Sequence, residues 1–237
     1  GDYAAALRCY SQAIGVDNTN GAYYGNRAAA WMMLGKYDKV VEDCAERLAR
    51  FPGQIVFSMR VLQINNYHRI VGGSDAVYFN TGALLEAHGH EVGWFAGLDP
   101  EAEPCKDARF FPRVVDMQNA RVSDMARYIR NREAAQKLDE MLVERGHFNV
   151  AHLHIYYGRL TAAVLGPLRA QGIPIVQSLH EYKLACPIYT MERDGDVCEK
   201  CVTGSTFNLL RYRCKGSLVR SVAAFAEYHA SRWQGDV

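Results

Sequence analysis

Several features are missing from this sequence, and each absence excludes a class of protein or partner. No uncharged apolar run approaches the roughly 20 residues that a membrane-spanning helix needs. The first residues lack the basic-then-apolar pattern of a signal peptide. An excess of one charge is also missing, since the net charge is +1 over 237 residues. We therefore expect no transmembrane segment and no nucleic-acid partner.

The cysteines are few and unevenly placed. There are seven, an odd number, and Cys9, Cys44 and Cys105 are scattered along the chain. This usage suits a reducing compartment, so the expected location is cytoplasmic. With 49% hydrophobic residues, the chain has enough material for one large or two smaller globular domains.

The N-terminal stretch, residues 1–54, carries an internal repeat. Gly1-Asp2-Tyr3 recurs 34 positions later as Gly35-Lys36-Tyr37. A period of this length with helix-turn-helix content resembles the tetratricopeptide repeat. The positions that match its signature are Tyr24, Ala28, Trp31, Gly35, Tyr37 and Pro52, whereas Arg27 and Val40 depart from it. Because Gly1 falls inside a repeat and no Met precedes it, we expect about one and a half repeats here and more upstream.

Such repeats stack into concave surfaces that bind partner peptides. Asn26-Arg27 resembles the Asn-Arg pair of repeats that clamp a partner's C-terminal carboxylate, and the resemblance makes Asn26 the candidate partner-binding residue. The alternative is a packing or spacer array without a clamp.

The stretch from Met59 to Val92 predicts the start of a Rossmann-like parallel sheet. Val61-Leu62-Gln63-Ile64 has the composition of a buried strand. A loop with Gly72-Gly73 leads into a helix that Ser74 or Asp75 can cap and Gly89 can end, and a second strand follows over 92–96. A glycine-rich loop before a helix favours phosphate binding, although the Gly-x-Gly-x-x-Gly fingerprint is absent and a glycine pair can simply form a turn.

A second β-α-β unit follows, and it carries histidines. We predict a short strand at 110–111, a helix over 122–145, strands over 149–155 and 173–180, and a helix over 159–170 between them. His154 and His180 fall at the carboxyl ends of these strands, where ligands bind in open parallel sheets. We therefore expect both to meet the Gly72-Gly73 loop in one crevice, and interpret His152 as pointing away from them.

Four segments together resemble the N-terminal half of family 4 glycosyltransferases: Leu62-Gln-Ile-Asn, Gly72-Gly-Ser, Val150-Ala-His-Leu-His and Ser178-Leu-His-Glu-Tyr. The resemblance covers residues 59–237 and implies the acceptor-side Rossmann-like domain of a GT-B fold. It also implies retaining transfer of a hexose from a nucleotide-sugar to a glycan, lipid or small-molecule acceptor, with no metal needed at the reaction centre.

The resemblance assigns roles to individual residues. Gly72, Gly73 and Ser74 would approach the donor diphosphate, and His180 would act beside the reacting sugar. His154, Glu181 and Tyr182 would contact the acceptor. The Glu-x7-Glu of the family's donor site does not occur in this sequence, so we expect the fragment alone to be inactive.

A cysteine cluster lies within an insertion over 181–215. Cys198 and Cys201 form a Cys-x-x-Cys pair, and Cys186 and Cys214 flank it. The spacing suits a structural zinc site with four cysteine ligands, while a disulfide or free thiols are the alternatives. A helix is predicted over 216–233.

Two further functions stay open for the whole chain. The first is a non-catalytic scaffold in which the repeats bind partners and the α/β domain is a vestigial sugar-binding module. The second is another phosphate-binding Rossmann enzyme that shares only the architecture.

Overall fold

The computed structural model describes residues 3–51, 58–115 and 124–235. The chain forms two compact units, Gly1–Ser58 and Met59–Val237. None of the helices in the described ranges is long and apolar enough to cross a bilayer.

The first unit consists of three helices, α1 (Tyr3–Val16), α2 (Gly21–Met33) and α3 (Tyr37–Arg50). The Asn20 side chain caps α2 by accepting a hydrogen bond from the Ala22 N–H at 3.0 Å. Gly35, with φ of +70°, makes the turn into α3. Buried Tyr24 and Ala28 fill the interior, as the repeat signature predicts. Pro52 of that signature lies outside the described residues.

Arg27, which departs from the repeat signature, joins two of these helices. Its guanidinium donates two hydrogen bonds to the Asp43 carboxylate of α3, at 2.9 and 2.6 Å. Asp43 is buried, so this bidentate pair supplies the partner that its charge needs. An ion pair thus replaces an apolar contact between α2 and α3.

The second unit contains a parallel sheet of four strands in the order β2-β1-β3-β4. The strands are β1 (Arg60–Ile64), β2 (Glu91–Phe95), β3 (Val150–Leu153) and β4 (Ile175–Gln177). The predicted α/β architecture with a parallel sheet is confirmed. The first two strands begin one residue earlier than predicted, and β3 and β4 are shorter than their predicted ranges.

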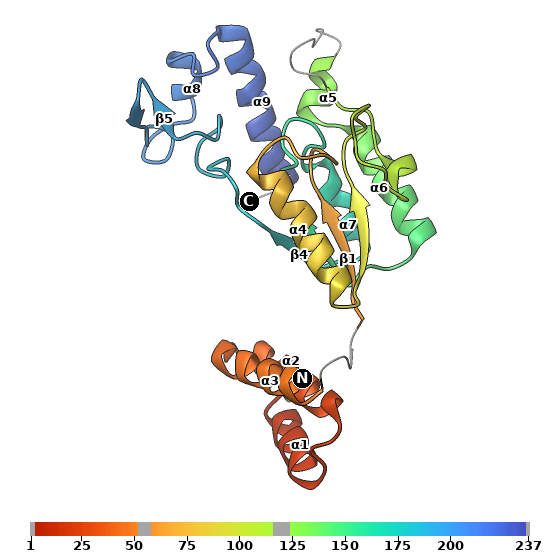
Figure 1. The fold of residues 1–237 in the computed structure, drawn as a ribbon. Helices are drawn as coiled ribbons and strands as arrows, with labels where there is room; N and C mark the ends of the chain where they lie inside the picture. The colour runs from red at the N-terminus through yellow and green to blue at the C-terminus, as the bar shows by residue number, and fades with distance from the viewer. Residues whose placement is uncertain (1–2, 52–57, 116–123, 236–237) are drawn as a thin grey trace. The chain divides into compact units, whose positions relative to one another are not determined.

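Helices cover both faces of the sheet (Figure 1). Helix α4 (Gly73–Ala87) packs on one face, where Gly82 faces the Trp94 ring of β2. The other face carries the main apolar core, shared with α6 (Arg132–Arg145), η3 (Ala162–Val164) and α7 (Leu165–Ala170). Helix α9 (Leu218–Gln234) contacts α5 (Met125–Ile129) and η3.

Three predicted elements are wrong in detail. The helix predicted over 122–145 is divided into α5 and α6, because buried Asn131 caps α6 and donates to the carbonyls of Arg113 and Arg159. The strand predicted at 110–111 is the end of a 3-10 helix, η1 (Ala108–Phe110). The helix predicted over 159–170 begins only at Ala162, after Thr161 caps it.

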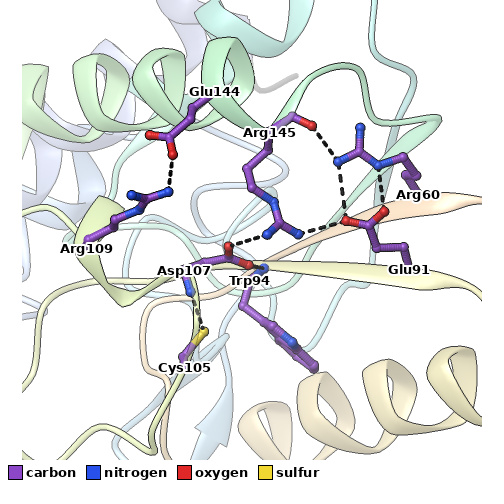
Figure 2. A network of polar contacts seen from close by, with 8 residues as sticks. All are labelled: Arg60, Glu91, Trp94, Cys105, Asp107, Arg109, Glu144 and Arg145. Atoms are coloured by element: carbon purple, nitrogen blue, oxygen red, sulfur yellow. Dashed lines mark hydrogen bonds and ion pairs between the residues drawn. The ribbon is translucent and has the colours of Figure 1, made fainter.

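A network of charged side chains holds the amino-terminal edge of the sheet (Figure 2). The Arg145 guanidinium, at the end of α6, lies between two carboxylates. It is 2.8 Å from an oxygen of Glu91 and 3.4 Å from an oxygen of buried Asp107. Arg60 of β1 also pairs with Glu91, at 2.9 Å. Asp107 accepts the Trp94 N–H at 3.0 Å, so the network ties α6 to β1, β2 and the η1 loop. Arg60 and Glu91 are the first residues of β1 and β2, so this part of the network lies at the opposite strand ends from His154 and His180.

Candidate functional site

Two histidines meet where β3 and β4 end. His154 follows β3 directly and His180 lies three residues beyond β4. Their rings stack with centroids 5.2 Å apart, and Nδ1 of His154 is 2.9 Å from Nε2 of His180. The predicted meeting of these two residues at the carboxyl edge is therefore observed.

A buried glutamine sets the protonation pattern of this pair. Gln63 of β1 is fully buried, and its Oε1 is 2.9 Å from Nε2 of His154. Burial, together with the charges of His152 and His180, lowers the pKa of His154 to about 3, so its ring is neutral at neutral pH. The carbonyl oxygen can only accept, so Nε2 of His154 carries the proton and Nδ1 accepts from His180. His180 is then left with an unprotonated Nδ1.

His152 joins the same cluster, contrary to our prediction. Its ring centroid is 4.2 Å from that of His154, and its Nε2 is 2.8 Å from the Ser178 hydroxyl. The physical reason is the two-residue repeat of an extended chain, which places residues 152 and 154 on the same face. The same alternation in the sequence therefore predicts His152 and His154 on one face of the sheet.

The Gly72-Gly73 loop leads directly into α4, for which Gly72 is the N-cap. The Asp75 carboxylate accepts the N–H groups of Val71 at 3.0 Å and Gly72 at 2.8 Å. It therefore caps the helix from inside the first turn, and its charge offsets part of the positive helix end. An anion bound here would have to use the backbone N–H groups of Gly73 and Ser74, which have no intrahelical partner.

The two glycines are not required by the packing of the chain itself. A Cβ placed at Gly72 or Gly73 would meet no heavy atom within 4 Å, and neither residue has a positive φ. The space beside this backbone is open, as close approach of a ligand requires.

Helix α4 and the histidines contact one another. The Tyr78 ring of α4 is 5.5 Å from the His154 ring in an edge-on arrangement. The pKa of His180 is lowered by burial, and the nearby Asp75 carboxylate offsets part of that shift. Helix α4 therefore lies near both histidines at the carboxyl edge of the sheet, and the meeting of the Gly72-Gly73 loop with them in one crevice stays a prediction.

A cavity of about 590 Å³ lies next to this edge and includes Glu181 among its lining residues. Burial raises the pKa of the Glu181 carboxyl, and Lys183 and Lys215 offset part of that shift. Tyr182 is 62% exposed and, in the described part of the chain, is not among the lining residues. The structure therefore separates two residues that the sequence predicts to act together.

Other residues of this cavity were not predicted. Cations line it, namely Arg159, Lys183, Lys215 and Arg220. Lys183 is buried and pairs with the buried Glu227 at 2.5 Å, whereas the Arg159 guanidinium lies over the Tyr67 ring. These residues come from separate segments that have no common sequence pattern, so only the fold brings them together.

The four predicted zinc ligands line a different cavity, of about 450 Å³. Cys186, Cys198, Cys201 and Cys214 all border it, and all four are free thiols. Burial and the three neighbouring cysteines raise the pKa of Cys201 to about 11. Among the described residues, no three ligand side chains already stand at metal-binding spacing.

Asn26, the predicted partner-binding residue, lies on α2 and is half-buried. Within residues 3–51, no hydrogen bond of its side chain is found, whereas the adjacent Arg27 is committed to Asp43. The Asn26 amide is therefore available to a ligand.

Comparison with known proteins gives partial matches to repeat proteins. The chain is 46% identical over 52 residues to the small glutamine-rich tetratricopeptide repeat-containing protein of Dictyostelium discoideum. The matched residues are 22% of this chain and 16% of the relative. It is 54% identical over 43 residues to the beta form of that protein from Homo sapiens, 18% of this chain and 14% of the relative. Hsp70-Hsp90 organizing protein 1 of Arabidopsis thaliana is 39% identical over 49 residues, 21% of this chain and 9% of the relative.

The repeat named in the first two relatives agrees with the kind of repeat that the 34-residue period of residues 1–54 predicts. The first unit is a helical segment, and the chain contains a stretch that is similar to tetratricopeptide-repeat proteins. The chain spans less than a fifth of the length of these relatives.

No family model and no solved structure matches the chain. The comparisons thus support the predicted repeats. The resemblance of the second unit to glycosyltransferases stays a prediction.

Proposed function

We propose that this protein binds a protein partner through its tetratricopeptide-repeat unit. The observation that carries the proposal is the similarity of the chain to repeat proteins at 39 to 54% identity. Repeats of this kind present concave surfaces for peptide segments. The uncommitted amide of Asn26 is a group that can hydrogen-bond to the C-terminal carboxylate of such a segment.

The partner class to test first comes from the relatives. One of them is named as an organizer of Hsp70 and Hsp90, so chaperones of these two classes are the proposed partners. Recognition would use the free carboxylate at the end of the partner's chain.

Titration calorimetry with the full chain tests this proposal. C-terminal peptides of Hsp70 and Hsp90 are compared with the same peptides amidated at the C-terminus. We expect binding by at least one free-acid peptide, weakened about tenfold by amidation and by Asn26→Ala, which corresponds to about 1.4 kcal/mol.

Asn18→Ala, in the exposed turn before α2, is the matched control and should bind normally. If neither peptide binds, or if Asn26→Ala binds as tightly as Asn18→Ala, the proposal is wrong.

We propose as a second function that the α/β unit acts in retaining glycosyl transfer from a nucleotide-sugar. Two specific observations support it, the histidine pair at the carboxyl edge of a parallel sheet and the open Gly72-Gly73 backbone before α4. In this proposal the N–H groups of Gly73 and Ser74 approach the donor diphosphate. The unprotonated Nδ1 of His180 accepts a hydrogen bond from a sugar hydroxyl at the reaction centre.

The acceptor side of the proposed enzyme is the cavity that Glu181 lines. His154 acts on the acceptor through His180, because its own ring is almost completely buried. Exposed Tyr182 would contact only an acceptor that extends beyond the cavity. Transfer itself requires no cofactor in this proposal.

Thermal protection of the full chain separates this function from other Rossmann enzymes. UDP-glucose and GDP-mannose are compared with NAD. A ligand present at 100 times its dissociation constant stabilises the folded state by about 2.7 kcal/mol. Because the Glu-x7-Glu of the donor site is absent, the chain would hold the donor by its diphosphate alone, without turnover. We expect protection by a nucleotide-sugar and loss of that protection in Gly73→Ala, whose unliganded melting temperature stays close to wild type because the new Cβ meets no neighbour.

Protection by NAD alone, by none of the three ligands, or equally in Gly73→Ala would overturn the assignment.

A further inference from the structure

The segment from Cys186 to Gly216 has almost no hydrophobic interior. Only three of its side chains are buried, namely Cys186, Pro187 and Leu209. Its regular structure is limited to two strands of two residues each, β5 (Glu192–Arg193) and β6 (Asp196–Val197), and the four-residue helix α8 (Asn208–Arg211). Small structures with so little buried apolar surface usually require a disulfide or a metal to hold them.

The backbone of this segment is also strained. Four of its non-glycine residues have a left-handed φ between 49° and 66°: Tyr189, Met191, Asp194 and Arg213. Outside the turns that favour this conformation, such a residue is strained and persists only where the surrounding structure fixes it. Asp194 belongs to the Asp194-Gly195 turn between β5 and β6, which favours this conformation by itself. The buried contacts of the segment are too few to fix the other three, so an additional constraint is needed.

Four cysteines supply the chemistry for that constraint. Cys198 and Cys201 come from the turn after β6, Cys214 from the turn after α8, and Cys186 from the start of the segment. All four border one cavity of about 450 Å³, and the remaining three cysteines of the chain do not line it.

We propose that Cys186, Cys198, Cys201 and Cys214 bind one Zn²⁺ in a closed, structural site of four thiolates. Thiolates select soft or borderline metals over Ca²⁺ and Mg²⁺, and four protein ligands leave no position for a catalytic water. The thiol protons are released on binding, so the four cysteines enter the site as thiolates. The side chains must turn toward the cavity centre, because no three ligands in the described residues yet stand at metal-binding spacing.

The zinc site would also stabilise the neighbouring cavity of about 590 Å³, which Glu181 lines. Pro187, Tyr189 and Lys215 line that cavity and are adjacent or close in the chain to Cys186 and Cys214. The segment packs beside α9 through α8 (Figure 1). Zinc would therefore stabilise one wall of the cavity without taking part in any reaction there, and the inference does not depend on either proposed function.

Metal analysis of the full chain, purified with reductant and without chelator and then incubated with Zn²⁺, is the test. We expect one zinc per chain, and in the cobalt-substituted protein the visible bands of a tetrahedral thiolate site. Cys198→Ser/Cys201→Ser should lose both signals. Cys9→Ser/Cys44→Ser, at exposed positions in the first unit, is the matched control and should keep them.

Two further measurements keep the proposal falsifiable if the double variant misfolds. Cys198→His, which retains a zinc ligand, should still bind one equivalent. Alkylation of the denatured chain without reductant should label all seven cysteines. A stoichiometry near zero after incubation with Zn²⁺, retention of zinc by Cys198→Ser/Cys201→Ser, or protection of cysteines by a disulfide would each overturn the proposal.

Discussion

At the scale of single residues, two buried histidines make stability depend on pH. His68 and His154 are 3% and 1% exposed, and burial is the main cause that lowers their pKa values to about 4 and about 3. In the unfolded chain both would titrate near 6.5. Between these values the unfolded state binds more protons than the folded state, so acid favours unfolding.

We therefore expect the second unit to lose stability as the pH falls below about 6.5, by up to about 1.4 kcal/mol per pH unit for each histidine. Urea titrations at pH 7.5, 6.5 and 5.5 measure this. His154→Gln should flatten the dependence, while His88→Gln, at an exposed position after α4, should leave it unchanged. A stability that is constant from pH 7.5 to 5.5 would contradict the assigned protonation states.

Two arginines of Figure 2 pair with carboxylates that differ in burial, so their substitution should cost different amounts of stability. Arg145 faces Asp107, which is only 1% exposed, so Arg145→Met leaves a buried carboxylate without its ion-pair partner. We expect a loss of about 3 kcal/mol in the free energy of unfolding. Arg109 pairs with Glu144 on the surface, and Arg109→Met should cost less than about 1 kcal/mol. Chemical denaturation of both variants checks the difference, and equal losses would contradict it.

Some residue roles could be predicted from the sequence and others could not. The positions of His154 and His180 followed from strand ends, because parallel strands place their carboxyl ends at one edge. The part played by Gln63 had no signal, since a glutamine in a strand gives no indication of what lies across the sheet. The inward cap by Asp75 was one of two predicted alternatives, and the hydrogen bonds to Val71 and Gly72 decide it.

At the scale of elements, the contact of α4 with β2 depends on one glycine. A Cβ at Gly82 would lie 1.9 Å from the Trp94 ring, so helix and strand approach too closely for any side chain there. We expect Gly82→Ala to destabilise the second unit by about 1 to 3 kcal/mol despite the better helix propensity of alanine.

A double-mutant cycle with Trp94→Leu tests the cause of this loss. Replacing the indole removes the ring that the new methyl group meets, so Gly82→Ala should cost much less in that background. An equal cost in both backgrounds would show that the loss does not come from this contact.

The elements were predicted with uneven success for physical reasons. The strands β1 to β4 are short apolar runs bounded by turn residues, and this pattern is a local property. The division between α5 and α6 is not local, because Asn131 forms hydrogen bonds to carbonyls 18 and 28 residues away. Helical periodicity continues through such a break, so a single sequence does not reveal it.

At the scale of the whole molecule, the chain contains two compact units, and we expect them to unfold separately. Calorimetry should show two transitions. Arg27→Ala, which leaves buried Asp43 unpaired, should lower only the transition of the first unit. Gly82→Ala should lower only that of the second. A single transition that both variants shift would contradict independent unfolding.

The function of the whole molecule is less predictable than its fold. The repeat period is a property of the sequence itself, and the comparisons support it. The resemblance of the second unit to a glycosyltransferase rests on short motifs, which define a parallel sheet and its edge more strongly than they define a reaction. The cationic cavity is assembled from distant segments and has no counterpart in any single motif.

The link from Gln63 through His154 to His180 also makes the site a natural spectroscopic reporter. The Nε2 proton of His154 is held by a fully buried acceptor, so its exchange with solvent is slow compared with that of an exposed imidazole. Ring protons that are usually lost to exchange broadening then become observable by nitrogen-15 NMR. We expect any molecule that hydrogen-bonds to Nδ1 of His180 to polarise the two rings and to shift the resonances of both ring N–H groups, which would report its binding without a label.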